Sequence, residues 1–481
     1  MTVLVVGAGR VGLVMAVALA RLGHRVVGLE KDAERVELLR RGRSPFWEAG
    51  LQEALPEEME SGRLQFLHLD EQAGITGTAG MPGSSQIVML CVGTPPASAG
   101  GVDLSQLEEA VDSLLPWLRG TNRKVVLVTK STVPVGTARA LAARIEAYGL
   151  SDRVLVASNP EFLREGTALE DALHPHRIVI GVREPEAAEI LRELYAPVDA
   201  PTVVTDWQTA ELSKYAANAF LATRLSFLNE LADLAEAMGA DVVQVAHCLG
   251  LDPRIGPHYL KAGLGYGGSC LPKDVAGLLH MAADLGIAPV LLGAVAAVNA
   301  ARPGKAVARL RQALGGRLAG RVVAVLGLSF KGGTDDLRSS PALEVVRQLL
   351  QAGARVRAYD PAHAPAPDLA RGLARAPARE PARELAIVKA RAAIPDPGGS
   401  LAIFPEAYEA VRGAQAVAVL TDWAEFPQLD WARIRALMTG RVVLDARLCL
   451  DEARLAGLGF TYLAPGRGQF PASPREAGEH G

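Results

Sequence analysis

The sequence predicts an α/β protein with two Rossmann-like, doubly wound domains joined by a long central helical connector. Three observations carry this prediction. Apolar runs of strand length alternate with helical stretches in the first part of the chain, an unbroken helical pattern follows, and a second strand–loop–helix series comes after it. With 481 residues, the chain is long enough for two or three domains with ample cores.

The first domain is predicted over residues 1–205 and should bind a dinucleotide. Alternation of strands and helices is typical of a parallel sheet that helices cover on both faces. The apolar runs that we interpret as its strands are Val3–Val6, Arg25–Leu29, Gln86–Val92, Val125–Thr129, Val154–Ala157 and Arg177–Gly181.

The helical connector is predicted over residues 206–315 and the second α/β domain over residues 316–465. Asp206 is a candidate N-cap for a helix that reaches about Met238, and further helices follow Asp274 to about Asn299. Residues 364–399, rich in Ala, Pro and Arg, predict a long excursion, and residues 466–481 predict a disordered tail. The strands expected in the second domain are Arg321–Leu326, Ala354–Tyr359, Ala416–Leu420 and Val442–Leu444.

Composition argues against several classes of function. The formal net charge is only −3, so an extended nucleic-acid or membrane surface is not expected. The chain begins with an apolar strand and shows no targeting signal or membrane-spanning run. Its four cysteines have neither metal nor disulfide spacing. We therefore expect a cytoplasmic protein with reduced thiols and no bound metal.

The segment GAGRVG at residues 7–12 follows an apolar strand and opens a helix. Gly7 permits the tight turn, Gly9 allows a pyrophosphate to approach, and Gly12 allows close packing of helix on strand. Glu30 ends the next strand, where a carboxylate can bind a ribose diol and favours NAD over NADP. A purely structural turn is the weaker alternative, because strand, helix and acid agree.

Three further loops follow strands of the same sheet, at the edge where ligands bind in open α/β sheets. The loops Cys91–Pro95 and Lys130–Thr137 carry small hydroxyl side chains that suit a ribose and a positioned water, although ordinary turns would look similar. Asn159–Gly166 carries two glutamates, of which one could act as a base and the other could orient a ligand. Two solvated acids remain an equal alternative.

Lys214 and Asn218 lie one turn apart on the predicted connector helix and therefore share a face. A lysine cation and an amide donor could stabilise a developing oxyanion. A simple surface pair has the same spacing, and the spacing alone barely favours the functional interpretation.

Cys270 is the strongest candidate for chemistry. It follows the glycine-rich turn Gly265–Gly268, which lets a ligand approach the backbone, and Lys273 and Asp274 come directly after it. A nearby ammonium favours the thiolate, which is the nucleophilic form. A thiolate beside a dinucleotide site indicates covalent oxidation of an aldehyde to an acid. The other cysteines lack such neighbours, and we interpret them as structural.

The loop Phe330–Pro341 after the first strand of the second domain is rich in Gly, Lys, Asp and Arg, which suits a second phosphate-bearing ligand. Arg254 and Arg447 are candidate clamps for phosphate or sugar. Taken singly, each arginine has a solvated surface position as its alternative.

With these motifs in order over about residues 2–465, the chain resembles the nucleotide-sugar dehydrogenase family, and within it the enzymes that oxidise UDP-glucose. The motifs are GAGRVG, CVGTP, KSTVPVGT, NPEFLREG, ELSKYAANAF, GYGGSCLPKD, FKGGTDDLRSSP and the Asp445–Arg447 segment DAR. The resemblance implies two α/β domains joined by a long helix through which homodimers form, NAD as cofactor and a UDP-sugar as substrate.

The resemblance also implies a role for each matching residue. The expected catalytic residues are Cys270 as nucleophile, Lys214, Asn218 and Asp274 at the substrate hydroxyl and oxyanion, Glu161 as base and Thr132 on the water. The expected cofactor residues are Gly7, Gly9, Arg10, Val11, Gly12, Glu30, Arg35, Thr94, Ser131, Thr132, Glu165, Lys273 and Arg338. The expected substrate residues are Phe162, Leu163, Lys214, Asn218, Arg254, Tyr259, Tyr266, Gly267, Phe330, Lys331 and Arg447, with Arg254 acting across a subunit interface.

The implied reaction is a four-electron oxidation of UDP-glucose to UDP-glucuronate through a thiohemiacetal and a thioester on Cys270. The same mechanism on GDP-mannose or a UDP-N-acetylhexosamine is an alternative, and a two-electron hydroxyacid dehydrogenase or a non-enzymatic binding protein are weaker ones. Leu271, where many UDP-glucose enzymes carry phenylalanine, and Leu448, where asparagine is common, depart from the pattern.

Overall fold

The structure is a computed structural model that describes residues 1–74, 87–97, 100–121, 123–363, 393, 394, 396 and 398–467. It divides into two compact units, the first of residues 1–218 and 276–287, the second of residues 219–275 and 288–481, and each is described by itself. The predicted excursion at 364–399 lies largely outside the described residues, as does the predicted tail from residue 468 on.

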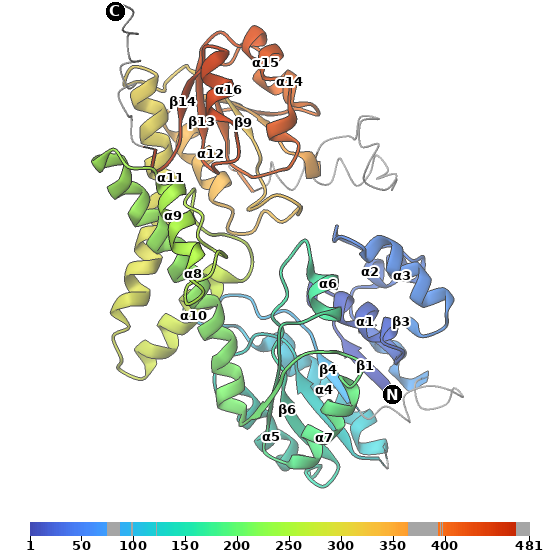
Figure 1. Cartoon of the computed structure of the whole chain (residues 1–481). Coiled ribbons are helices and arrows are strands. Elements are labelled where there is room, and N and C mark those ends of the chain that lie inside the picture. Colours follow the sequence, from blue (N-terminus) through green and yellow to red (C-terminus); the bar gives the residue numbers. More distant parts are fainter. Residues whose placement is uncertain are drawn as a thin grey trace, which may run out of the picture. The chain divides into compact units, whose positions relative to one another are not determined.

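The first unit is built on a sheet with the strand order β3-β2-β1-β4-β5-β6-β7-β8, so β1 lies inside the sheet and the chain winds outward on both sides of it (Figure 1). Its strands are β1 (Thr2–Val6), β2 (Arg25–Glu30), β3 (Leu64–His68), β4 (Ile87–Leu90), β5 (Val125–Thr129), β6 (Val154–Ser158), β7 (Ile178–Val182) and β8 (Thr202–Thr205). Its helices include α1 (Arg10–Arg21), α2 (Ala33–Arg40), α3 (Leu51–Glu60), α4 (Ser105–Gly120), α5 (Thr137–Ala147), α6 (Ala168–Leu173) and α7 (Pro185–Leu194).

Apolar side chains of β1 alternate between two cores, which is why the strand reads as a continuous apolar run. Val3 and Val5 belong to the core that α1 covers, whereas Leu4 and Val6 belong to the core on the opposite face. This double burial confirms the predicted doubly wound architecture.

Two features of this sheet were not predicted. The first is the pair of edge strands, β3 and β8, which were not identified from the sequence. Strand β8 is exposed or half-buried along its four residues, so it lacks the long apolar run that marks a buried strand. In addition, β7 pairs with β6 in the antiparallel direction, through Ala157 and Val182, whereas the other neighbouring strands of the sheet are parallel. Apolar periodicity is the same in either direction, so the sequence pattern could not reveal this reversal.

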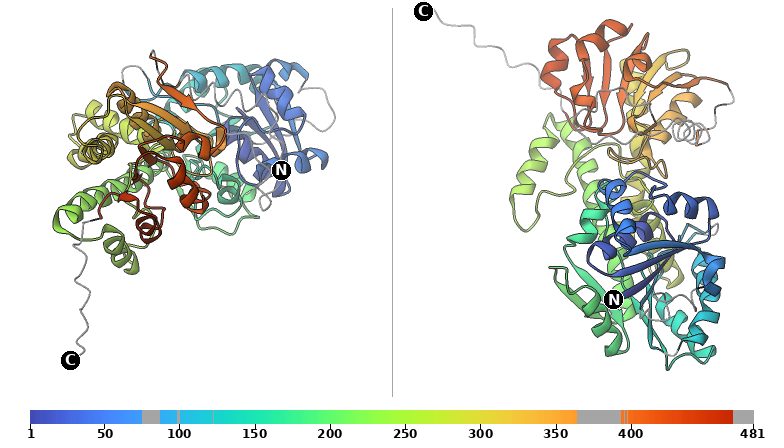
Figure 2. Two further views of the ribbon diagram at one scale, coloured as in Figure 1. Left: turned by 90° about the horizontal axis from the view of Figure 1, so that it is seen from above. Right: turned by 90° about the vertical axis from the view of Figure 1, so that its right-hand side faces the viewer.

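The second unit contains an all-parallel sheet with the order β11-β10-β9-β12-β13-β14, whose strands lie side by side in orange to red in Figure 2. Val323 and Val325 of β9 enter one core, and Ala324 and Leu326 enter the other, so this sheet is also covered on both faces. Its strands are β9 (Val322–Leu326), β10 (Arg355–Tyr359), β11 (Leu401–Ile403), β12 (Ala416–Val419), β13 (Val442–Asp445) and β14 (Thr461–Leu463). Its helices include α9 (Val242–Leu251), α11 (Val290–Ala313), α12 (Pro341–Gln351), α14 (Ala407–Val411), α15 (Trp431–Leu437) and α16 (Glu452–Gly457).

Two helices belong in part to each unit. The long helix α8 (Trp207–Met238) begins after Asp206, whose carboxylate accepts the N–H of Thr209 at 2.8 Å, as the predicted N-cap requires. The other is α10 (Leu271–Asp284). Helix α11 continues to Ala313 instead of ending near Asn299, with Pro303 inside it. The three-part division of the sequence stays a prediction.

Candidate active site

The turn after β1 has the geometry of a dinucleotide-binding turn. Gly7 adopts φ +90°, and a Cβ on Gly12 would lie 1.8 Å from the carbonyl oxygen of Gly7, so both positions require glycine. A Cβ on Gly9 would meet no atom within 4 Å. Gly9 therefore faces open space at the start of α1, where the helix N-terminus favours an anion such as a pyrophosphate. Arg10 and Val11 form the first turn of this helix.

The Glu30 carboxylate is buried at the end of β2 and fixed from several sides. It accepts the N–H groups of Ala8 (2.9 Å), Lys31 (2.9 Å) and Asp32 (3.0 Å). It also binds the guanidinium of Arg35 at 3.1 Å. Four donors match the roughly four lone-pair positions of a carboxylate. Arg35 is the one donor among the four that comes from a partly exposed side chain.

The predicted hydroxyl residues tie the strand-end loops of this unit together. The hydroxyl of Ser131 donates to the carbonyl of Val92 at 2.6 Å, and that of Thr94 donates to the carbonyl of Thr132 at 2.9 Å. Nearby, Glu165 and Arg10 form an ion pair at 2.6 Å. The structure thus joins the loops after β4 and β5 to each other, and it joins the start of α1 to the loop after β6.

Glu161 and Lys214 form a buried ion pair in the same unit, with Oε1 and Nζ 3.2 Å apart. The other oxygen of Glu161 accepts the N–H of Leu163 at 2.6 Å. The ring of Phe162 lies against Lys214, 5.5 Å from Nζ to the ring centre, and against the guanidinium of Arg177. This is a desolvated cation beside a candidate base, an arrangement that can move a proton or stabilise an oxyanion.

Asn218 is buried one turn beyond Lys214 on α8, as the spacing predicts. Between these residues, Tyr215 contacts α10: a Cβ on Gly277 would lie 3.1 Å from the Tyr215 ring. In this unit α8 therefore presents Lys214 to the loop that carries Glu161 and packs on α10 through Tyr215.

In the second unit, Cys270 lies directly before the first residue of α10 and is exposed. The carbonyl of Cys270 accepts the N–H of Asp274 at 2.9 Å, and the hydroxyl of Ser269 lies 3.6 Å from its sulfur. Lys273 binds the fully buried Asp274 at 2.6 Å. The thiol of Cys270 is therefore accessible at the N-terminus of α10, where the helix dipole favours a negative charge.

The other cysteines have different surroundings. Burial raises the pKa of Cys91 to about 12, and it raises the pKa of Cys449 to about 12. Both are therefore thiols at neutral pH, in agreement with their predicted structural role. Cys248 is exposed on α9.

The glycines before Cys270 pack closely against another loop of this unit. A Cβ on Gly267 would lie 2.4 Å from the carbonyl oxygen of Ser339, and one on Gly268 would lie 2.9 Å from the ring of Phe330. These glycines allow the loop of Phe330–Pro341 to pack on the turn. The adjacent Tyr266 exchanges backbone hydrogen bonds with the amide of Asn299, and burial raises the pKa of its phenol to about 12.

Arg447 joins three loops of the second unit. Its guanidinium donates to the carbonyls of Leu420 (2.7 Å), Phe330 (2.8 Å) and Gly265 (3.4 Å). Burial lowers the pKa of this arginine. These bonds use three of its five N–H groups. The predicted sugar clamp is thus also a brace between the Phe330 loop and the turn that leads to Cys270.

The remaining predicted residues are more exposed. Arg254 is turned toward Asp252 of its own loop (2.6 Å), Arg338 pairs with Asp336 (2.6 Å), and Lys331 lies over the Phe330 ring. In the described part of the chain, the non-glycine residues with positive φ are Tyr259, Ser339 and Leu448. The last two adjoin Arg338 and Arg447. Asparagine tolerates this left-handed conformation better than the leucine at position 448.

Sequence reasoning missed two buried glutamates, Glu48 and Glu211. Glu48 accepts the N–H groups of Gly166 (2.9 Å) and Ala168 (2.7 Å) at the start of α6. Glu211 binds the start of α5 in the same way, and burial raises its pKa. Glu48 lies in the loop before α3, and Glu211 lies in a helical pattern, where a glutamate ordinarily signals a solvated face, so no local feature marked either one.

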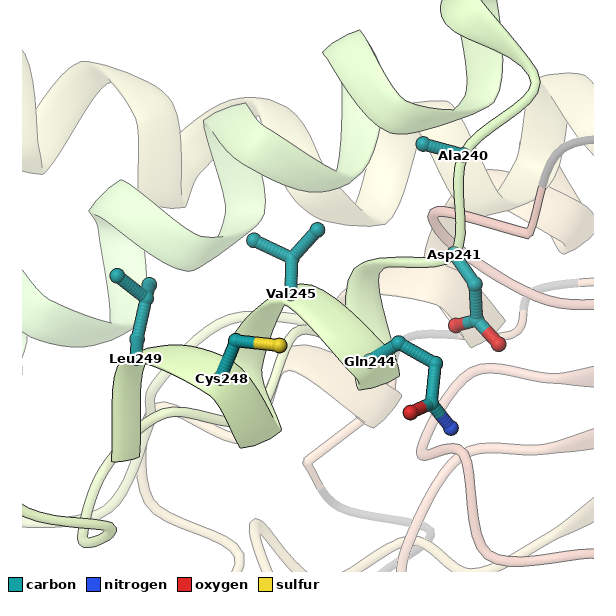
Figure 3. Close-up of a pocket in the computed structure, with 6 residues that line it drawn as sticks. All are labelled: Ala240, Asp241, Gln244, Val245, Cys248 and Leu249. Atoms are coloured by element: carbon teal, nitrogen blue, oxygen red, sulfur yellow. The ribbon is translucent and has the colours of Figure 1, made fainter. Parts of the chain in front are cut away.

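Elsewhere in the second unit, an open groove of about 720 Å³ runs along α9 (Figure 3). Its lining is mostly apolar and includes the exposed Cys248, and it contains none of the residues predicted for the site. Among the described residues, no group of side chains is arranged to hold a metal ion. No helix in that part of the chain is both long and apolar enough to cross a bilayer.

Three family models match successive parts of the chain. They describe the NAD binding domain (residues 1–199), the central domain (residues 208–301) and the UDP binding domain (residues 324–452) of the UDP-glucose/GDP-mannose dehydrogenase family. Together they span most of the sequence in the order in which its motifs occur.

Relatives match along nearly the whole chain. A UDP-glucose 6-dehydrogenase from Pseudomonas aeruginosa is 41% identical over 475 residues, which cover 97% of this chain and 98% of the relative. The structure of a UDP-glucose dehydrogenase from Pyrobaculum islandicum has a TM-score of 0.82 at 40% identity and covers 97% of each chain. That of a UDP-D-ManNAc dehydrogenase from Pyrococcus horikoshii has a TM-score of 0.79 at 26% identity and covers 98% of this chain and all of the other (100%). The chain belongs to the UDP-glucose/GDP-mannose dehydrogenase family, with NAD as its cofactor.

Proposed function

We propose that this protein is a UDP-glucose 6-dehydrogenase that oxidises its substrate twice at one site and holds the aldehyde covalently on Cys270. The observation that carries the proposal is the accessible thiol of Cys270 at the start of α10, beside the Lys273–Asp274 pair. UDP-glucose is favoured as the substrate, because relatives named for it are 40–41% identical and the UDP-D-ManNAc enzyme is 26% identical.

NAD supplies the hydride acceptor for each oxidation, and the open space at Gly9 and the carboxylate of Glu30 fit its pyrophosphate and ribose. In the first oxidation carbon C6 of the sugar loses a hydride and its hydroxyl group loses a proton, which gives the aldehyde. Asp274 and Lys214 are proposed to handle that proton and Asn218 to hold the oxygen. The Cys270 thiolate then adds to the aldehyde carbon and forms a thiohemiacetal.

The second oxidation removes a hydride from the thiohemiacetal carbon and a proton from its oxygen, which leaves a thioester on Cys270. Glu161 is proposed to take a proton from a water that Thr132 holds. The resulting hydroxide attacks the thioester carbon, and the C–S bond breaks to give the carboxylate and free Cys270. The Lys214–Glu161 pair supports these roles, since the lysine can stabilise the oxyanion while its partner carries the proton.

The test is the stoichiometry of NADH formed per sugar consumed, with UDP-glucose, UDP-ManNAc and GDP-mannose in parallel. Two NADH per UDP-glucose with a uronate product is the expected result. Cys270→Ser should abolish formation of the uronate. One NADH per turnover, or full turnover of the serine variant, would contradict the covalent mechanism. Two NADH with another sugar alone would change the substrate and keep the mechanism.

We also propose that the enzyme is a homodimer that pairs through α8. Exposed apolar side chains repeat along this helix at Phe220, Phe227, Leu234 and Met238, a spacing of seven, seven and four that keeps them on one face. The family resemblance places dimer contacts on this helix and an arginine matching Arg254 across them. Phe227→Glu should yield monomers in sedimentation and weaken the binding of the UDP-sugar.

A further inference from the structure

Glu211 occupies an unusual place for a carboxylate. It lies in the first turns of α8 and is 2% exposed, together with Lys214 (3%) and Asn218 (7%). The spacing of three and seven residues places all three on one face of the helix. This face therefore carries a buried polar stripe, of which only Lys214 and Asn218 have assigned roles in the proposed function.

The carboxylate of Glu211 caps a helix from another part of the chain. Its Oε2 accepts the N–H of Gly136 at 2.6 Å and its Oε1 accepts the N–H of Ala138 at 2.7 Å. Gly136 is the N-cap residue of α5 and has no side chain with which to satisfy these groups. A serine or aspartate at the cap would satisfy a helix locally. Capping from α8 instead joins α5 to the helix that carries Lys214.

The loop before this cap carries Ser131 and Thr132. Its first part is fixed by the hydrogen bonds that join Ser131 to Val92 and Thr94 to Thr132, and its last part is fixed by Glu211. Three residues along α8, Lys214 binds Glu161 in the loop after β6. The same helix face thus docks on the loops that follow β5 and β6.

We propose that Glu211 is a positioning residue that holds the Thr132 loop and Lys214 in register for hydrolysis of the thioester. The inference rests on the proposed function, because it needs a covalent intermediate on Cys270. Displacements of about 1 Å at a catalytic group can cost on the order of 100-fold in rate. The step that depends on both Thr132 and the Lys214–Glu161 pair is attack of water, so that step should slow most.

The test compares Glu211→Gln and Glu211→Asp with Glu58→Gln. Glutamine keeps the shape of the side chain but turns an NH2 group toward one of the two N–H donors, whereas aspartate keeps the charge. Glu58 is the control because it is also buried, in α3, where it pairs with Arg63 at 2.9 Å outside the proposed site. The measurements are kcat, both KM values, the melting temperature and the intact mass of the enzyme during turnover.

For Glu211→Gln we expect kcat to fall about 10- to 100-fold. Because the slowed step follows both oxidations, both KM values should fall with kcat, and kcat/KM should stay within roughly twofold. A uronyl adduct on Cys270 should accumulate during turnover. Glu211→Asp should recover part of the rate. Glu58→Gln should melt earlier and keep kcat within roughly twofold, without an adduct.

Wild-type kcat in Glu211→Gln, or a lower kcat without the adduct, would overturn the inference, as would equal losses in the Glu58 variant. If the glutamine variant does not fold, accumulation of the adduct in Glu211→Asp decides in the same way. Failure of the proposed function appears separately, in the wild type, as fewer than two NADH per UDP-glucose. The rate comparison is then made with the nucleotide sugar that the wild type oxidises, and an unchanged kcat in Glu211→Gln still overturns the inference.

Discussion

The two α/β units begin in the same way and then diverge. Gly7 and Gly327 follow the first strand of each sheet with φ +90° and +95°, and each donates its N–H at 2.7 Å to a carbonyl of the neighbouring strand. The next N–H binds an acid at the end of that strand, Ala8 to Glu30 at 2.9 Å and Leu328 to Asp360 at 2.6 Å. The local start of a dinucleotide fold is therefore present twice.

What differs is the distance along the chain from the glycine to the helix. In the first unit α1 begins at Arg10 and leaves open space beside Gly9, whereas in the second α12 begins only at Pro341. The intervening loop of the second unit is bound to Asp360, because Ser329 donates both its N–H (2.9 Å) and its hydroxyl (3.0 Å) to that carboxylate. Where the first unit has open space beside Gly9, the second unit has a loop that bears Lys331 and Arg338. The same strand and turn can serve different ligands.

The largest expected effect comes from substituting the glycines in the turn after β1, where the two units differ. Gly12→Ala would place a methyl group 1.8 Å from a carbonyl oxygen, so α1 must move. We expect a loss of about 3 kcal/mol or more in the free energy of unfolding and the loss of NAD binding. Gly9→Ala is the matched control, since its methyl meets no atom within 4 Å.

The Gly9 variant should unfold within about 1 kcal/mol of the wild type and still bind NAD at least roughly tenfold more weakly, because the methyl group occupies the approach of the pyrophosphate. Denaturant unfolding and calorimetric titration of NAD measure the two quantities. Unchanged NAD affinity in the Gly9 variant would mean that the cofactor lies elsewhere.

Substitutions of the two acids, Glu30 and Asp360, should affect the KM values of different ligands. Asp360→Ala leaves buried N–H groups of Leu328 and Ser329 without an acceptor, at about 1–3 kcal/mol each, and frees the loop that leads to Lys331. We expect the KM for the UDP-sugar to rise by roughly an order of magnitude and the KM for NAD to rise less, because of the loop's residues only Arg338 is expected to bind the cofactor. Glu30→Ala should have the opposite pattern in steady-state kinetics. If both variants raise mainly the same KM, the conclusion that the two units bind different ligands is wrong.

The smallest effect concerns pH. Burial lowers the pKa of His24 in the first unit from its ordinary 6.5, so the folded state prefers the neutral ring. Stability from this group is complete above pH 6.5 and is lost as pH falls through the folded pKa. In the second unit burial raises the pKa of Glu425, so the folded state prefers the neutral carboxyl group. This carboxyl group accepts a hydrogen bond from the Tyr359 hydroxyl at 2.7 Å. Its contribution is complete below its ordinary 4.5 and is lost as pH rises through the folded pKa.

His24→Gln should therefore flatten the acid side of a plot of melting temperature against pH, and Glu425→Gln should flatten the side above pH 4.5. At the pH where the other group titrates, the melting temperature of each variant should follow that of the wild type, and this agreement is the control. A change on the wrong side for either one would contradict the assigned direction of its pKa shift.

The sequence by itself determined the fold class and the ligand-bearing motifs. Runs such as Val3–Val6 had to be buried on both faces, which only a sheet covered by helices on both sides can provide. Gly7 and Gly12 mark this turn because the positive φ of the first and the close packing of the second both require glycine. Such features are local, so their physical cause is written in consecutive residues.

Only the tertiary structure decided which partner each polar group meets. It directs Glu211 to the N–H groups of Gly136 and Ala138, joins Arg447 to three loops, and shows that the glycines before Cys270 accommodate the Phe330 loop. It also reverses β7 against β6. These pairings join residues far apart in sequence, and a buried carboxylate or guanidinium is stable only where the folded chain supplies its partners. Neither the periodicity of apolar residues nor the spacing within a motif indicates which distant residues will be those partners.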